Sequence, residues 1–272
     1  MKAVVINSYG APKVLQCTDI DRPKIAADQL LVKVSASSVN PVDWKIRRGD
    51  LQLLSGFNFP KVLGSDLSGV VVEVGRFVKK FQPGDEVYTL VNPLKGGAYA
   101  EYVAVPEANA ALKPQNLTHA QAAAVPIAGL TAFQSLMDLG QLRPGQKVLI
   151  NGASGGVGTF ALQIAKAFSA QVTGVCSAKN ARLVEGLGSD RVIDYAEVDF
   201  TSETQKYDLI FDAVGMRSFS ACEKVLEPQG RYISTLPSFE NIAPNLASLF
   251  FSGKKAKLVM AIATPRDLKI GR

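Results

Sequence analysis

The sequence has little cysteine, a single histidine and no long apolar run, and each scarcity excludes a class of protein. The three cysteines, Cys17, Cys176 and Cys222, are odd in number and far apart, so they offer neither a disulfide framework nor a paired metal-ligand spacing. No apolar run reaches the ~20 residues of a membrane span, and the chain starts on a strand pattern without a cationic leader. We therefore expect a cytoplasmic protein without a membrane span.

The charge balance also lacks a concentrated sign. Thirty basic and twenty-four acidic side chains leave a formal charge of +6, and the basic residues occur in ones and twos. Scattered charge of this kind does not predict a nucleic-acid partner. A chain of 272 residues with 47% hydrophobic side chains can bury a core, and its length favours two domains over one.

The first part of the chain, up to about Pro106, reads as short β-segments broken by glycine and proline. This pattern predicts a compact, mostly antiparallel β-domain with strands at 3–6, 29–36, 69–74, 86–89 and 100–105. Helical spacing follows at 117–140, where Thr118 and Gln121 fit a capping box. We place the domain junction there, which predicts a substrate-binding domain at 1–122 and a cofactor domain at 123–272.

From Gly145 onward, strand and helix patterns alternate, and the strands are apolar throughout. This predicts an α/β domain with a parallel sheet covered on both faces, the doubly wound dinucleotide-binding fold. A buried strand at 147–151 leads into a glycine-rich turn and then directly into a helix. Glycines permit the tight turn and let a pyrophosphate approach the helix N-terminus. The predicted cofactor-binding residues of this turn are Gly152, Ser154, Gly155, Gly156, Val157 and Gly158.

The end of the next strand, "VTGVCSAKNAR", distinguishes between the two nicotinamide dinucleotides. It lacks the carboxylate that would hold a ribose 2′-hydroxyl, and it contains Ser177, Lys179 and Arg182. A hydroxyl and two cations suit a 2′-phosphate, so NADPH is the predicted cofactor. The alternative for Lys179 and Arg182 is that they are solvated helix residues. A short-chain dehydrogenase does not fit, because Tyr195, Tyr207 and Tyr232 all lack a lysine four positions later.

Seven segments in order carry a family resemblance: "SSVNPVDWKIRRG", "LGSDLSGVVVEVG", "FQPGDEV", "AAAVPIAGLTAF", "GASGGVG", "GSDRVIDY" and "FDAVG". Together they resemble the medium-chain dehydrogenase/reductase superfamily, in particular its zinc-independent quinone oxidoreductase branch of ζ-crystallin-like and chloroplast-envelope quinone oxidoreductase-like proteins. The resemblance runs from Met1 to about Pro265. It implies a GroES-like β-domain followed by a Rossmann domain.

The same resemblance implies a site without metal. The positions that hold catalytic zinc in zinc-bearing relatives correspond here to Asn40, Ser65 and Ile127, which are poor zinc ligands or cannot ligate at all. The single histidine, His119, lies in the first turn of the capped helix and is expected to be structural. An acceptor must then take hydride readily, which quinones and α,β-unsaturated carbonyl compounds do.

Site residues follow from this resemblance. Asn40 is the expected hydrogen-bond donor to the acceptor oxygen, with capping of the turn before Pro41 as its alternative role. Asp43 is expected to order the loop and Lys45 to assist electrostatically. Trp44 is expected to lie in the core, with a wall of the pocket as its alternative role. Thr131 is expected near the nicotinamide, with helix packing as the alternative. The remaining residues implied around the nicotinamide and the adenosine are Tyr195, Ala213, Val214, Gly215, Leu236 and Pro237.

The predicted function is NADPH-dependent transfer of hydride to a quinone or an enone. The alternative is a cofactor-binding protein of the same family with a structural or regulatory role and little turnover, and a weaker option is a zinc-free reductase of saturated aldehydes or ketones. The resemblance also implies a homodimer paired through the last cofactor-domain strand, "KLVMAIA". Relatives continue past Arg272 with elements that return to the β-domain. We therefore expect either that this closing segment is missing here or that the contact between the domains is built differently.

Overall fold

The computed structural model describes residues 1–236, 253–259, 261–264 and 267–268. The chain divides into two compact units, Met1–Leu130 with Ile262–Arg272, and Thr131–Ala261. The expected domain division differs from this at two places: the first boundary lies inside a helix, beyond residue 122, and the residues after Ala261 group with the first unit. No helix in the described part of the chain is long and apolar enough to cross a membrane.

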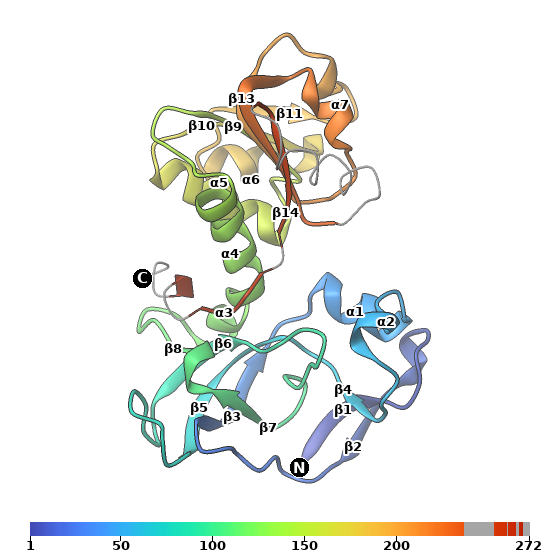
Figure 1. The fold of residues 1–272 in the computed structure, drawn as a ribbon, viewed down its shortest axis with the longest axis vertical. Helices are drawn as coiled ribbons and strands as arrows, with labels where there is room; N and C mark the ends of the chain where they lie inside the picture. Colours follow the sequence, from blue (N-terminus) through green and yellow to red (C-terminus); the bar gives the residue numbers. More distant parts are fainter. Residues whose placement is uncertain (237–252, 260, 265–266, 269–272) are drawn as a thin grey trace. The chain divides into compact units, whose positions relative to one another are not determined.

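The first unit contains two antiparallel sheets (Figure 1). The larger has the order β7-β3-β5-β6-β8, with strands β3 (Gln29–Ser37), β5 (Asp66–Val74), β6 (Glu86–Leu90), β7 (Tyr102–Pro106) and β8 (Ala110–Leu112). The smaller has the order β2-β1-β4, with strands β1 (Lys2–Ile6), β2 (Leu15–Asp19) and β4 (Lys61–Val62). Alternate residues of β3 and β5, such as Leu30, Val32 and Val71, are buried in one core. The mostly antiparallel β-domain is therefore confirmed.

Short helices complete this unit. They are η1 (Pro12–Val14), α1 (Pro41–Arg48), α2 (Gln52–Ser55), η2 (Glu107–Asn109), α3 (His119–Ala123) and α4 (Pro126–Phe133). The helical spacing expected over 117–140 is split, because α3 ends before Pro126, whose ring begins α4. Six further residues form a π-helix, η3 (Gln134–Leu139).

The second unit is built on one parallel sheet of order β11-β10-β9-β12-β13-β14. Its strands are β9 (Lys147–Asn151), β10 (Gln171–Cys176), β11 (Arg191–Asp194), β12 (Tyr207–Asp212), β13 (Leu226–Ser234) and β14 (Lys255–Leu258). Its other helices are α5 (Gly156–Ala167), η4 (Ala178–Asn180), α6 (Ala181–Gly186), η5 (Phe200–Ser202) and α7 (Phe219–Glu223). This strand order is that of the doubly wound dinucleotide fold, which confirms the predicted class.

Both faces of this sheet are covered. Val148 and Ile150 of β9 pack in one hydrophobic core, whereas Leu149 between them packs in another. Successive side chains of a strand point to opposite faces, so the two cores lie on the two sides of the sheet. For the same reason the middle residues of β9 and β12 are apolar at successive positions, with polar residues toward the strand ends.

Several elements were not predicted. Strand β2 has five exposed residues, so it shows no alternation of buried and exposed positions. Strands β4 and β8 are only two and three residues long. Strand β14 begins before the expected "KLVMAIA" and ends at Leu258, and Met260 lies outside the described residues.

A glycine in β5 provides a test of the first sheet. A Cβ atom at Gly69 would overlap the carbonyl oxygen of Lys33 on the neighbouring strand β3. We expect Gly69→Ala to lower the free energy of unfolding by about 1–3 kcal/mol, as overpacking does. Urea unfolding measures this, with Gly186→Ala as the control, because a Cβ there meets open space in α6. Equal stabilities of the two variants would contradict the packing described.

Candidate active site

The glycine-rich turn of the second unit folds back closely on its neighbours. The N–H groups of Gly152 and Ala153 both donate to the carbonyl oxygen of Val175, at 3.0 Å each. Gly152 has a φ of +82°, and a Cβ there would overlap Val214. A Cβ at Gly158 would overlap the carbonyl oxygen of Gly152. Only glycine fits these two positions, so the turn depends on its sequence motif.

The helix after this turn presents an open N-terminus. Gly155 is the N-cap of the twelve-residue helix α5 and supplies no side-chain cap. A Cβ at Gly156 would meet open space. The first N–H groups of a helix have no partner within it and carry the positive end of the helix dipole. Their availability beside open space fits a pyrophosphate.

The residues predicted to hold a 2′-phosphate follow strand β10. The side-chain amide of Asn180 donates to Ser154 Oγ at 3.1 Å and to Ser177 Oγ at 3.3 Å, which joins the glycine turn to this strand end. Lys179 and Arg182 are exposed, and neither forms an ion pair within the described part of the chain. Sequence reasoning missed Asn180, because an asparagine in a polar turn carries no distinguishing pattern.

Tyr195 lies at the same edge of the sheet. It follows β11, whose last residue Asp194 pairs with Cys176 at the end of β10. The Tyr195 N–H donates to the carbonyl oxygen of Cys176 at 3.2 Å, and its side chain is 59% exposed. The structure therefore places Tyr195 beside the strand end that carries Ser177.

A buried carboxylate shapes the loop after β12. Asp212 is 0% exposed, and its Oδ1 accepts the N–H groups of Val214 and Gly215 at 3.1 and 2.9 Å and the side-chain amide of Asn151 at 2.9 Å. The N–H of Ala213 donates to the carbonyl oxygen of Asn151 at 3.1 Å. The predicted residues 213–215 are therefore held by Asp212, which sequence reasoning overlooked although it is the polar end of an apolar strand.

Three further predicted cofactor residues have simpler surroundings. Leu236 packs against the loop, since a Cβ at Gly215 would lie 2.6 Å from the Leu236 side chain. Pro237 lies outside the described residues. Thr131 is on α4 and is only 8% exposed.

In the first unit, the loop before α1 is built on a buried carboxylate. Asp43, 3% exposed, accepts the backbone N–H of Asn40 at 2.8 Å, the hydroxyl of Ser65 at 2.9 Å and the hydroxyl of Tyr99 at 3.0 Å. Burial raises the pKa of Asp43 above its ordinary value, although these hydrogen bonds oppose the shift. Asp43 thus joins the N-terminus of α1 to two distant segments.

A second carboxylate, Asp66, lies in the same cluster. It accepts the hydroxyl of Ser38 at 2.7 Å, the side-chain amide of Asn40 at 3.0 Å and the backbone N–H of Ile127 at 2.9 Å. It is 0% exposed, and burial raises its pKa from 3.8 to about 7. The Asn40 amide also donates to Ser38 Oγ at 2.9 Å, so both of its hydrogens are directed inward.

The structure brings together Asn40, Ser65 and Ile127, the three positions that the sequence resemblance equates with the zinc ligands of zinc-bearing relatives. Ser65 donates to Asp43, while Asn40 and the backbone of Ile127 donate to Asp66. Within the described residues, no group of three or more His, Cys, Asp and Glu is arranged to hold a metal. Ser38, Tyr99 and Asp66 were missed, because their partners are far away in the sequence.

The environment of Trp44 differs from the expectation. Trp44 is 38% exposed and not in the core. The Lys45 amine lies 5.7 Å from its ring centroid and the Arg48 guanidinium 4.8 Å. On the surface helix α1, stacking by long cationic side chains covers the indole in place of core packing. Lys45 is half-buried.

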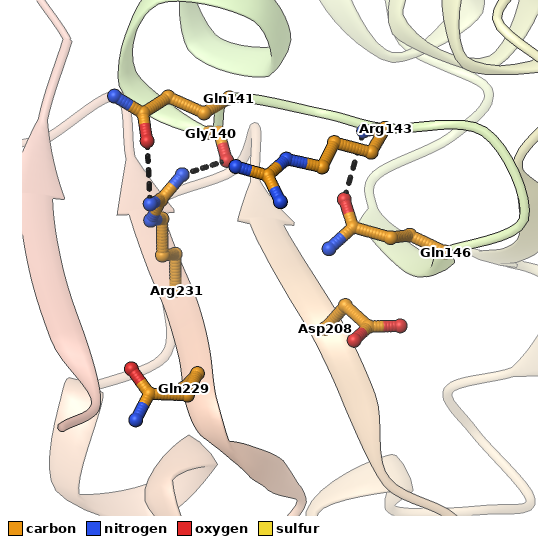
Figure 2. Close-up of a pocket in the computed structure, with 7 residues that line it drawn as sticks. All are labelled: Gly140, Gln141, Arg143, Gln146, Asp208, Gln229 and Arg231. Atoms are coloured by element: carbon orange, nitrogen blue, oxygen red, sulfur yellow. Dashed lines mark hydrogen bonds between the residues drawn. The ribbon is translucent and has the colours of Figure 1, made fainter.

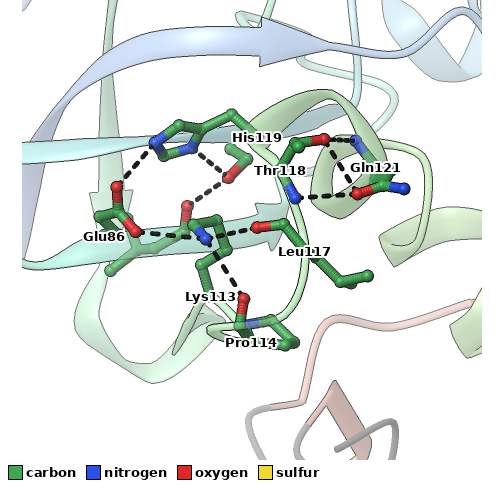
Figure 3. Close-up of polar contacts among 9 residues, drawn as sticks. Glu86, Lys113, Pro114, Leu117, Thr118, His119 and Gln121 are labelled. Atoms are coloured by element: carbon green, nitrogen blue, oxygen red, sulfur yellow. Dashed lines mark hydrogen bonds and ion pairs between the residues drawn. The ribbon is translucent and has the colours of Figure 1, made fainter.

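His119 has the structural role that was expected of it (Figure 3). Its Nδ1 lies 2.8 Å from Ser68 Oγ and its Nε2 3.2 Å from Glu86. Glu86 also pairs with Lys113 at 3.2 Å. Thr118 and Gln121 form the predicted capping box of α3. These contacts attach α3 to the larger sheet.

The raised pKa of Asp66 predicts how stability depends on pH. In the folded protein the Asp66 carboxyl keeps its proton up to about pH 7, whereas in an unfolded chain it loses the proton near pH 3.8. The free energy of unfolding therefore falls as pH rises between these values. The loss amounts to roughly 4 kcal/mol at most. We expect Asp66→Asn to gain in stability relative to wild type from pH 4.5 to about 7.5 in urea unfolding.

Asp190→Asn is the matched control, since the hydrogen bond from Lys166 lowers the pKa of Asp190. Its difference from wild type should stay constant above about pH 5. A constant difference for Asp66→Asn as well would show that Asp66 titrates as an ordinary carboxyl.

Comparison with known protein families gives two matches. Residues 26–115 match the family described as "Alcohol dehydrogenase GroES-like domain". Residues 156–260 match the family described as "Zinc-binding dehydrogenase".

Three curated relatives are similar over most of the chain. The human mitochondrial NAD(P)H oxidoreductase RTN4IP1 is 43% identical, over 79% of this chain and 60% of that protein. The chloroplastic quinone-oxidoreductase homolog of Spinacia oleracea is 36% identical, over 87% of this chain and 75% of that protein. The chloroplastic NADPH-dependent alkenal/one oxidoreductase of Arabidopsis thaliana is 39% identical, over 84% of this chain and 59% of that protein. The chain thus spans about 60% of the length of the first and third relatives.

Solved structures agree in fold. The quinone oxidoreductase of Coxiella burnetii has a TM-score of 0.87 and 31% identity, over 99% of this chain and 86% of that chain. The quinone oxidoreductase of Escherichia coli, complexed with NADPH, has a TM-score of 0.85 and 27% identity, over 99% and 85%. The resemblance found in the sequence motifs is confirmed. The chain belongs to the medium-chain dehydrogenase/reductase superfamily, in its quinone oxidoreductase branch.

Proposed function

We propose that this protein transfers hydride from NADPH to a quinone or an α,β-unsaturated carbonyl compound. NADPH supplies the hydride, and the acceptor supplies an electron-poor carbon and an oxygen that gains negative charge. The protein contributes binding, orientation and hydrogen bonds to that oxygen. Relatives named quinone oxidoreductase and alkenal/one oxidoreductase support this class of substrate.

The observation that carries the proposal is the set of side chains at Asn40, Ser65 and Ile127. Around the two buried carboxylates, these residues act as hydrogen-bond donors through an amide, a hydroxyl and a backbone N–H. An isoleucine side chain has no atom that could ligate zinc, and amide and hydroxyl groups are poor ligands beside thiolate and imidazole. A site lined by hydrogen-bond donors and without strong zinc ligands favours acceptors that are already electrophilic.

We assign the donor role to Asn40. Its amide hydrogens bind Ser38 and Asp66, so one bond must be exchanged for the acceptor oxygen. The neutral bond to Ser38 is the weaker one, because a hydrogen bond to a carboxylate is about twice as strong. Exchange at Ser38 leaves the amide anchored on Asp66. Asp43 orders the loop, and Lys45 adds positive charge near it.

The cofactor preference rests on residues around the end of β10. Ser177, Lys179 and Arg182 offer one hydroxyl and two exposed cations for a 2′-phosphate. The open helix N-terminus at Gly155 and Gly156 suits the pyrophosphate, and Tyr195 suits the adenosine. Val214, Gly215 and Leu236 suit the nicotinamide side, with Ala213, Thr131 and Pro237 assigned there by family resemblance.

The same family resemblance favours a homodimer. Strand β14 is the outermost strand of the described sheet, and β13 is its only partner there. An outermost strand has backbone groups available for pairing with a second copy about a two-fold axis.

Turnover with three acceptors tests the function. We expect oxidation of NADPH with a benzoquinone or a short enone, and none with a saturated aldehyde. Asn40→Ala should lower kcat/KM about a hundredfold, as loss of an oxyanion donor does. Asn92→Ala is the matched control, because Asn92 caps an exposed turn in the same unit through the N–H of Leu94.

Other outcomes have definite meanings. NADPH binding without oxidation in the presence of either electrophile would overturn the enzyme proposal and favour the cofactor-binding alternative. Activity with the saturated aldehyde alone would favour the third hypothesis. Full activity of Asn40→Ala would remove Asn40 from the site.

Cofactor selectivity tests Lys179 and Arg182. The double variant Lys179→Ala, Arg182→Ala should raise the KM for NADPH at least about tenfold and leave the KM for NADH unchanged, since only NADPH carries the 2′-phosphate. Lys224→Ala, which removes a cation beyond α7, should change neither. Equal KM changes for NADPH and NADH would show that Lys179 and Arg182 do not bind the 2′-phosphate.

A further inference from the structure

A polar pocket lies in the second unit, away from the residues assigned to the cofactor (Figure 2). Its volume is about 280 Å³. It is lined by the segment after η3, the residue before β9, the start of β12 and part of β13. The lining residues are Gly140, Gln141, Arg143, Gln146, Asp208, Gln229 and Arg231.

The pocket lies at the amino-terminal ends of the parallel strands, whereas the glycine turn lies at their carboxyl ends. Gln146 precedes β9, whereas Gly152 follows it, and the strands are parallel. The five residues of β9 separate these ends by about 16 Å at 3.3 Å per residue. A ligand in this pocket would therefore be separate from a dinucleotide on the glycine turn.

Two arginines bring positive charge to the pocket. Arg231 donates to the carbonyl oxygen of Gly140 and, at 2.6 Å, to the Gln141 side chain. Arg143 is exposed, and its guanidinium has no hydrogen bond or ion pair within the described part of the chain. The carboxylate of Asp208 also lines the pocket, and one of its oxygens accepts the backbone N–H of Lys147 at 2.8 Å. The two guanidinium groups therefore face one carboxylate in the lining.

These cations repel one another. Burial lowers the pKa of Arg231, and the charge of Arg143 lowers it further. Burial and then the charges of Arg231 and Lys255 lower the pKa of Lys257, whose amine donates to the carbonyl oxygen of Leu139 at 3.2 Å. Positive charge is therefore in excess at this edge, and a bound anion would compensate it.

The shape of the donors indicates the kind of anion. A guanidinium presents several N–H groups in a plane, which matches the oxygens of a phosphate. The Oε1 of Gln146 accepts the backbone N–H of Arg143 at 2.9 Å. The amide hydrogens of Gln146 remain as donors. Gln141 and Gln229 add two more neutral amides to the lining. Two guanidinium groups and three neutral amides outnumber the single carboxylate of Asp208, and they suit a phosphate oxyanion that has several acceptor atoms.

We propose that this pocket binds a phosphate dianion, either free or as a small phosphomonoester, through Arg143 and Arg231. The volume exceeds the space that one phosphate fills, so it also admits a short substituent. The exposed Arg143 guanidinium binds the anion, and Arg231 contributes a second positive charge from a fixed position on β13.

Calorimetric titration of the full chain saturated with NADPH tests this site, with inorganic phosphate and glycerol phosphate as separate probes. NADPH keeps the dinucleotide site occupied, and phosphate binding at Arg143 should persist. Arg143→Gln should weaken binding of both probes at least about tenfold. Arg143→Lys should have a smaller effect, because it retains the charge and loses the planar fork.

Arg76→Gln is the control, since it makes the same charge change on the first unit, beside Phe77. Tighter binding of glycerol phosphate than of phosphate identifies a phosphomonoester site, and the reverse identifies a free phosphate site. No binding of either probe at about 10 mM, or wild-type binding by Arg143→Gln, overturns the proposal. Arg143→Gln removes no hydrogen bond or ion pair of the side chain within the described residues, so we expect the variant to fold as wild type does.

Discussion

The cost of burying a carboxylate without a cation beside it determines the local structure around the proposed donor. Asp66 is fully buried, and the groups that approach it are a hydroxyl, an amide and a backbone N–H. Each of these stabilises the ionised form, yet desolvation outweighs them and raises the pKa to about 7. The loop before α1, the start of β5 and the N-terminus of α4 must therefore converge on one side chain. Asp43 imposes the same demand through Asn40, Ser65 and Tyr99, and Asn40 contacts both carboxylates.

A buried carboxylate, Asp212, likewise fixes the loop after β12 in the second unit. Asp212 accepts backbone N–H groups of Val214, Gly215 and Arg217, and the Asn151 amide holds it from β9. A buried acceptor that is satisfied by consecutive N–H groups specifies the course of a loop more tightly than apolar packing would. Both units thus place their functional loops by local polar networks, on a framework that hydrophobic burial stabilises.

Local patterns could be predicted from the sequence, and long-range polar contacts could not. Strands β9 and β10, the glycine turn and the capping box at Thr118 depend on neighbours in the chain, and they occur where the pattern indicates. Asp66 binds partners 26 and 61 residues away, so no local spacing reveals its role. Among the described strands β2 pairs with β1 alone, and all five of its residues are exposed. Trp44 was misplaced because neighbouring cations cover it on the surface.

The hydrogen bond from Asn40 to Asp66 makes the orientation of the Asn40 amide depend on the protonation state of Asp66. Ionised Asp66 can accept from Ser38 and Asn40 together, which fixes the nitrogen of Asn40 toward it. Protonated Asp66 gains a hydroxyl donor that competes for the same space, and the preference for the amide nitrogen weakens. Asn40 itself does not titrate, so any pH dependence of its orientation arises from its neighbour. The Asn40 amide is neutral, and ionised Asp66 holds it in place. The proposed site therefore offers the substrate oxygen an oriented hydrogen bond without a charge beside it, which is consistent with chemistry that depends on electrophilic substrates.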